Sequence, residues 1–167
     1  GEGDYCNSAE TSPRETSKTL TQYTVTLNPD GGTGNFSGWS NYTMTVDAGT
    51  EVTLPELFKT GYNFAGWYDG ELVNSPYTVT KTVTLTAQWT AKTYNIIYKD
   101  QGNADFTGAN EADLPATHTY GQQTDLVDAT KSGYNFLGWF TTAYCSGSAI
   151  TQLGATEYTG NITLYAK

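Results

Sequence analysis

The sequence predicts a mostly β protein, bordering on α+β, that consists of two small modules in tandem and contains little helix. One observation is a repeated decapeptide: residues 59–68 read KTGYNFAGWY and residues 131–140 read KSGYNFLGWF, with seven of ten positions identical. Another is an alternation of apolar and polar residues with period two, which indicates half-buried strands. Finally, no window of eleven or more residues sustains the period of an amphipathic helix.

Period-two alternation marks the strands that we expect to open and close each module. The strands predicted in this way cover residues 23–27, 42–46, 83–89, 94–98 and 162–166. Clusters of Pro, Asp, Asn and Gly, such as Pro29 to Gly32, separate these runs and predict turns.

The spacing of 72 residues between the two decapeptides defines the domain organisation. We expect a flexible leader at 1–20, a first module at 21–91 and a second module at 92–167. The leader is polar and has no periodicity, which is typical of disorder. Residues 90–93 contain no Gly or Ser spacer, so the last strand of the first module should lead almost directly into the second module. This predicts a short, semi-rigid rod.

Composition excludes several classes of partner. Of the 167 residues, 15% are charged and 14% aromatic, and the net charge is −9. No basic cluster is present, so nucleic acid and anionic membranes are poor partners. No apolar run approaches the 18 residues of a membrane span, so we expect no membrane insertion by this segment.

The decapeptide predicts aromatic anchors for the core. Phe64 and Trp67 have opposite parity in a strand, but a β-bulge at Gly66 would bring both rings to the same side. We therefore predict a structural core that contains Phe64, Trp67, Trp89, Phe136 and Trp139. The alternative is an exposed aromatic platform that binds sugar or peptide.

Several segments together resemble one known family. YTVTLNPDGG, KTGYNFAGWY and VTLTAQW in the first module, and YNIIYKDQGN, KSGYNFLGWF and NITLYAK in the second, resemble the Listeria–Bacteroides repeat, of the internalin B-repeat type. The resemblance covers everything except the leader. It implies β-grasp-like modules in tandem on secreted or surface-anchored bacterial proteins, which are often adhesins. It implies no catalytic residues.

Enzymatic chemistry is not expected. His118 is the only histidine, it has no Ser or Cys partner in a motif, and we expect a structural or half-exposed strand residue there. Carboxylates are scattered singly, with Asp125 and Asp128 as the nearest pair of interest. The loop at 28–35 lacks the alternating carboxylates and the final Glu of a calcium site. We predict no catalytic residue, no metal site and no cofactor.

Trp39 and Phe36 are the candidate ligand contacts. Trp39 has no aromatic counterpart in the second module, and tryptophan is enriched at binding hot spots. Local packing of their loop is the alternative interpretation. Two functional hypotheses follow: a cell-surface adhesion module that binds a protein or glycan ligand or presents another domain, and a structural stalk without a ligand of its own.

The two cysteines, Cys6 and Cys145, are too few for a metal site. They leave two interpretations open. One is a disulfide that ties the leader to the second module, which requires an oxidising compartment. The other is two separate thiols.

Overall fold

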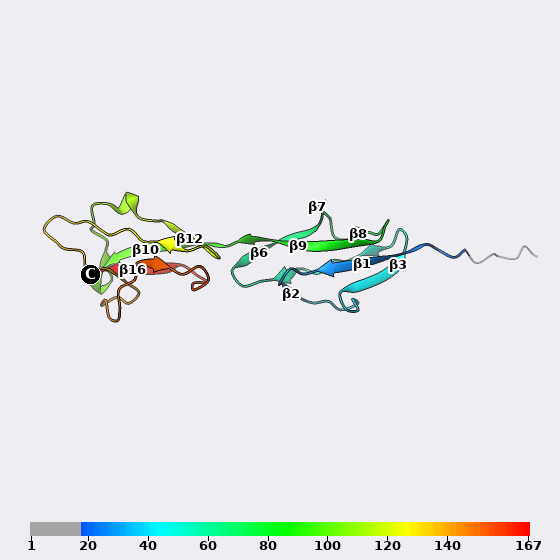
Figure 1. Cartoon of the computed structure of the whole chain (residues 1–167), viewed down its shortest axis with the longest axis horizontal. Helices are drawn as coiled ribbons and strands as arrows, with labels where there is room; N and C mark the ends of the chain where they lie inside the picture. The colour runs from blue at the N-terminus through cyan, green and yellow to red at the C-terminus, as the bar shows by residue number, and fades with distance from the viewer. Residues whose placement is uncertain (1–17) are drawn as a thin grey trace, which may run out of the picture.

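The computed structural model describes residues 18–167. The chain forms an elongated molecule in which two β units lie end to end (Figure 1). Most of the leader predicted at 1–20 lies outside the described residues, and so does Cys6. Within the described part, neither of the two short helices has the length or the apolar character to cross a membrane.

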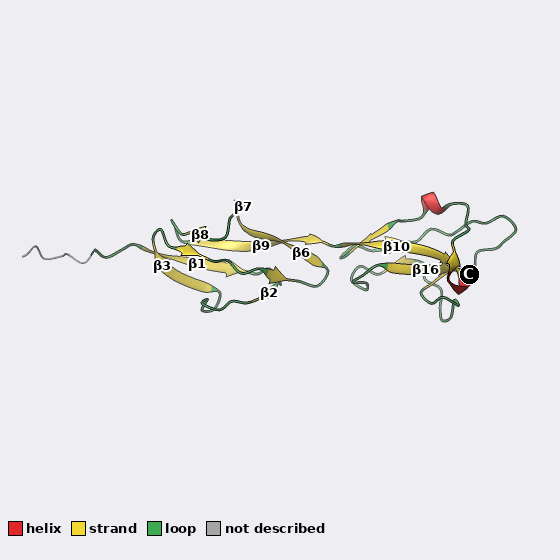
Figure 2. Ribbon diagram, turned by 180° about the vertical axis from the view of Figure 1, so that it is seen from behind, coloured by secondary structure: helices red, strands yellow, loops and turns green. Residues whose placement is uncertain are grey.

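The prediction of mostly β structure is confirmed, since strands dominate residues 18–167 and helix in this part of the chain is limited to two short 3₁₀ turns (Figure 2). The first repeat contains β1 (Gln22–Asn28), β2 (Thr33–Gly34), β3 (Thr43–Asp47), β4 (Glu51–Val52), β5 (Leu57–Phe58), β6 (Tyr62–Asp69), β7 (Glu71–Leu72), β8 (Tyr77–Thr78) and β9 (Val83–Ala91). The second contains β10 (Thr93–Asp100), η1 (Gln101–Asn103), β11 (Ala104–Asp105), η2 (Glu111–Asp113), β12 (Thr117–Thr119), β13 (Thr124–Asp125), β14 (Trp139–Phe140), β15 (Gln152–Leu153) and β16 (Ile162–Ala166).

The main sheet of the first repeat has the strand order β3-β1-β9-β6-β7. Its centre is a parallel pair, β1 beside β9, with Val25 opposite Val83 and Leu27 opposite Leu85. All four of these side chains are buried, whereas the threonines between them are more exposed. The period-two pattern therefore places one apolar face of the sheet against the core.

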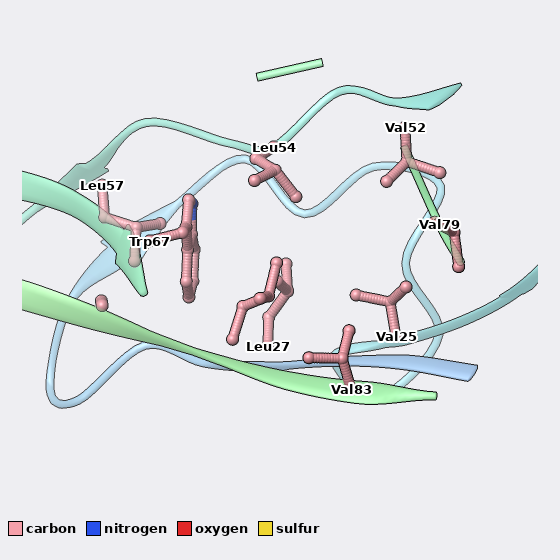
Figure 3. Packing of buried hydrophobic residues seen from close by; sticks show 10 residues of the cluster. Val25, Leu27, Val52, Leu54, Leu57, Trp67, Val79 and Val83 are labelled. Atoms are coloured by element: carbon pink, nitrogen blue, oxygen red, sulfur yellow. The ribbon is translucent and has the colours of Figure 1, made fainter. Parts of the chain in front are cut away.

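The core of the first repeat lies between this apolar face and the loops that cross it. Val52, Leu54, Leu57 and Val79 come from the crossing segments and pack over the sheet together with Trp67 (Figure 3). Burial of these aliphatic side chains supplies the main favourable term for a unit this small.

The second repeat has the same parallel centre, with β10 beside β16 and Ile96 opposite Ile162. It has its own core around Leu114, Trp139, Leu153 and Leu164. A parallel pair flanked by antiparallel strands in each repeat is consistent with a β-grasp-like arrangement.

The two decapeptides adopt different lengths of strand. In the first repeat, β6 spans eight residues and pairs with β9, whereas in the second only Trp139 and Phe140 form a strand, β14. The reason lies in the partner strand, because Tyr62–Phe64 pair with Trp89–Ala91 and residues 134–136 have no strand partner.

The structure contains the bulge expected at Gly66. The pairing of β6 with β9 shifts register between Phe64 and Gly66. Gly66 has a backbone φ of 122°, a value that residues with a side chain rarely adopt. The shift brings the rings of Phe64 and Trp67 together, with centroids 5.8 Å apart.

Candidate functional site

The tryptophans of the two decapeptides occupy equivalent positions in the two cores. Trp67 is 3% exposed and Trp139 is 1% exposed. Each indole N–H donates a hydrogen bond of 2.8 Å to a backbone carbonyl twelve residues earlier, that of Pro55 or that of Val127. A buried N–H without an acceptor costs free energy, so these bonds help to fix the orientation of each ring.

The other three predicted core aromatics, Phe64, Trp89 and Phe136, are partly buried. The Trp89 ring lies 5.3 Å from the Phe64 ring, and the Lys59 ammonium lies 5.5 Å from its centroid. The Trp89 indole N–H is buried and has no hydrogen-bond partner among the described residues.

The junction between the repeats is a nearly continuous strand. Lys92 alone separates β9 from β10, and its N–H donates a hydrogen bond of 2.8 Å to the Gly61 carbonyl of the first repeat. Its carbonyl accepts a hydrogen bond of 2.9 Å from the Tyr120 N–H of the second repeat. One residue therefore joins the backbones of the two repeats.

Side chains reinforce this junction. The rings of Tyr62 and Tyr120 meet edge to face, with centroids 5.5 Å apart. Gly61 packs directly against the Tyr120 ring, because a Cβ at that position would lie 2.2 Å from Tyr120 Cδ1. Its φ of 80° independently favours glycine. The alternation of apolar residues does not reveal this contact, although Tyr120 stands where the first repeat has Ala48, and this difference was a signal for it.

The two candidate ligand contacts lie in one loop. The backbone N–H of Trp39 donates a hydrogen bond of 2.9 Å to the Phe36 carbonyl. Both side chains are partly buried against the core of the first repeat. Asn41 and Tyr42 have positive φ, so β3 begins at Thr43 and not at Tyr42 as predicted. This turn places the Tyr42 ring edge-on to Phe36, with centroids 4.8 Å apart.

His118 is a fully buried strand residue. Its Nδ1 lies 2.7 Å from the Thr124 hydroxyl, and its ring meets Tyr158 edge to face at 6.2 Å. The structure does not bring it together with Asp125 and Asp128 as hydrogen-bond partners.

Cys145 is 4% exposed, and burial raises the pKa of its thiol. Because Cys6 lies outside the described residues, both interpretations of the two cysteines, a disulfide or two separate thiols, stay open.

Charged groups on the surface form isolated pairs. The Lys81 ammonium lies 2.7 Å from Asp69, and the Lys99 ammonium lies 2.9 Å from Asp105. The hydrogen bond from Lys99 lowers the pKa of the Asp105 carboxyl. In residues 18–167, no group of three or more His, Cys, Asp or Glu side chains is arranged to hold a metal ion.

Comparison with known proteins gives three curated relatives. Two proteins of Evansella cellulosilytica, both named as membrane proteins and one as Gly-rich, are 30% and 28% identical over 71% and 78% of this chain. Internalin H of Listeria monocytogenes is 29% identical over 70% of the chain. The matched regions make up 17%, 16% and 20% of those proteins, so the chain spans about a fifth of their length or less. No solved structure matches the chain.

The Listeria-Bacteroides repeat domain matches the chain twice, at residues 23–90 and 94–167. These two matches contain the parallel strand pairs, the two cores and both decapeptides described above. The chain belongs to the Listeria-Bacteroides repeat family.

Proposed function

We propose that the chain is a non-catalytic repeat segment of a secreted or surface-attached bacterial adhesion protein, which holds another part of that protein away from the cell. The proposal rests on the junction between the two repeats. A strand path interrupted only by Lys92, with Tyr120 packed on Gly61, opposes bending between the repeats. The relatives named as an internalin and as membrane proteins support the surface location.

A spacer must keep its length, and this can be tested with a displayed reporter. A binding domain attached to bacteria through this chain should reach and hold a ligand-coated surface. The same domain on a flexible Gly/Ser linker of equal residue number should do so less efficiently, because the linker's ends approach each other as a random coil. Equal capture by both linkers would contradict the spacer role.

A second candidate function is direct binding of a protein or glycan, favoured by the partly exposed Trp39 and Phe36 in one loop. It predicts saturable binding of the purified chain to a panel of glycans, mucin and matrix proteins. Trp39→Ala should reduce that binding, whereas Tyr144→Ala, which removes an aromatic side chain that is 78% exposed in the second repeat, should not. If no member of the panel binds, the spacer role alone is supported.

A further inference from the structure

A groove of about 910 Å³ lies where the two repeats meet, beside the path from β9 into β10 (Figure 1). Phe58, Lys59 and Tyr62 line it from the first repeat. Tyr120 lines it from the second repeat, and Lys92 lines it from the junction. The volume lies within the range of small-molecule sites, about 300–1,000 Å³. The groove therefore has room for a ligand that contacts both repeats.

Two lysines give this groove a positive character in an acidic chain. The chain has a net charge of −9, yet two of its eight basic residues, Lys59 and Lys92, line the groove beside one carboxylate, that of Glu56. Neither ammonium belongs to an ion pair within residues 18–167. Lys59 Nζ donates a hydrogen bond of 3.1 Å to the Asp30 carbonyl, and an ammonium has three donors. The groove thus suits an anionic ligand, such as a carboxylate.

Aromatic and neutral polar side chains lie in the same groove. Phe58 is 67% exposed, and the rings of Tyr62 and Tyr120 meet there edge to face. A sugar ring has an apolar C–H face that packs on such rings, which offer rigid apolar area. The exposed side chains of Asn63 and Thr156 also line the groove and provide donors and acceptors for hydroxyl groups. This combination of side chains fits a saccharide.

The backbone of the groove is less suited to a peptide strand. Leu57–Phe58 already pair with Thr33–Gly34. Tyr62–Phe64 already pair with Trp89–Ala91. An added peptide strand binds mainly through main-chain hydrogen bonds, whereas a saccharide is recognised by side chains. The side chains of the groove therefore favour a saccharide over a peptide.

We propose that the groove between the two repeats binds an oligosaccharide of uronic acids. Each sugar of such a chain carries a carboxylate, so that two successive carboxylates face Lys59 and Lys92. The C–H face of one sugar packs on the exposed ring of Phe58. The site is separate from the loop of Trp39 and does not depend on the proposed spacer role.

The test is a titration of the whole chain with trigalacturonic acid, followed by NMR. We expect saturable shift changes at residues 58–63, at Lys92 and at Tyr120, and a weaker affinity in high salt because the ions screen exposed charges. The methyl ester of the same trisaccharide keeps the sugar rings and removes the charges. It should bind about fivefold more weakly or less tightly still, because the ion pairs are lost.

Variants of exposed side chains locate the site. Lys92→Gln should weaken binding by about two- to fivefold, the range that an exposed ion pair supplies. Lys81→Gln is the matched control, because it removes the same charge from an ammonium that pairs with Asp69 outside the groove. Phe58→Ala should weaken binding by about fivefold through lost packing. Tyr144→Ala, which removes an exposed ring outside the groove, should leave the affinity unchanged.

Equal affinities for the acid and its ester would overturn the proposal, and so would the absence of binding by the acid. Shift changes confined to the loop of Trp39 would also overturn it, and they would support the second candidate function instead. Tighter binding of acetyl-Asp-Asp-Asp-amide would assign the groove to acidic peptides. Tighter binding of sialyllactose would assign it to glycans with a single terminal carboxylate. Either result would overturn the proposed uronic acid site.

Discussion

Tyr120 of the second repeat packs edge to face on Tyr62 of the first, with ring centroids 5.5 Å apart and Gly61 beneath the Tyr120 ring. The contact lies next to the only residue between β9 and β10, so it acts where the chain would otherwise bend. The second decapeptide has a glycine at the equivalent position. The effect of the contact can therefore be measured separately from the conformational cost of replacing the glycine.

Gly61→Ala should uncouple the two repeats. Gly61 and Gly133 have nearly the same φ, 80° and 82°, so an alanine costs roughly 1–2 kcal/mol at either position. Only at Gly61 does the added Cβ meet the Tyr120 ring, since nothing lies within 4 Å at Gly133. Residual dipolar couplings should fit a single alignment tensor for the parent and for Gly133→Ala. They should require two tensors for Gly61→Ala, and one shared tensor there would contradict the proposed role of this contact.

Removal of either core tryptophan should unfold the repeat that contains it. Trp67→Ala and Trp139→Ala each empty a buried site and delete a hydrogen bond to a carbonyl, so we expect a loss of about 3–5 kcal/mol. Because the cores are separate, amide NMR signals of the other repeat should stay dispersed. Tyr144→Ala is the exposed control and should change stability by less than about 0.5 kcal/mol. A melting temperature within a few degrees of the parent would disprove the core assignment.

The two bulge glycines should differ in their tolerance of alanine. Gly66 and Gly138 share an unusual φ, 122° and 125°, so the backbone cost is similar, roughly 1–3 kcal/mol. A Cβ at Gly66 would meet Leu72 Cδ1 at 2.5 Å, the mobile end of a side chain that is 56% exposed.

A Cβ at Gly138 would meet Ala149 Cβ at 2.5 Å, an atom that cannot move without its backbone. We therefore expect Gly138→Ala to lower the urea midpoint of its repeat more than Gly66→Ala does. The reverse order would show that the backbone near Ala149 yields more easily than the side chain of Leu72.

Alkaline pH should destabilise the second repeat through Tyr98. Its hydroxyl donates a hydrogen bond of 2.6 Å to the Pro115 carbonyl, and burial raises its pKa to about 12. An unfolded tyrosine has a pKa of about 10, so the folded state retains a proton that the unfolded chain loses. This stabilising contribution is complete below about pH 10 and is lost as the pH rises toward 12.

Urea midpoints of the two repeats, followed by NMR across this range, should fall more steeply for the second repeat. The equivalent position in the first repeat is Leu27, which does not titrate. Tyr98→Phe should flatten the dependence, and an unchanged slope in this variant would assign it to other groups.

The sequence predicts the parts of the fold that depend on local pattern. Period-two alternation located β1, β9, β10 and β16, and the parity conflict between Phe64 and Trp67 located the bulge at Gly66. The absence of a spacer at 90–93 predicted the near-continuous strand path through Lys92.

Features that depend on distant partners could not be predicted in this way. Two nearly identical decapeptides become a strand of eight residues and a strand of two, because strand length depends on the neighbouring strand. Trp89–Ala91 lie beside the first decapeptide, whereas no strand lies beside the corresponding residues of the second. The surroundings of Trp39 and Phe36 depend on positive φ at Asn41 and Tyr42, which the alternation of apolar residues does not reveal. The contact of Tyr120 with Gly61 requires the geometry of both repeats.

The parallel pairs at the centre of each repeat determine how the molecule responds to tension. The strand that enters a repeat lies beside the strand that leaves it and points the same way, as β1 does with β9 and β10 does with β16. Pulling on the two ends therefore slides these neighbours past each other in shear, and the hydrogen bonds between them carry the load together. A hairpin pulled at its ends opens one bond at a time. A pulling force that fluid drag exerts along the molecule would therefore act on two shear-resistant units in series, linked through Lys92.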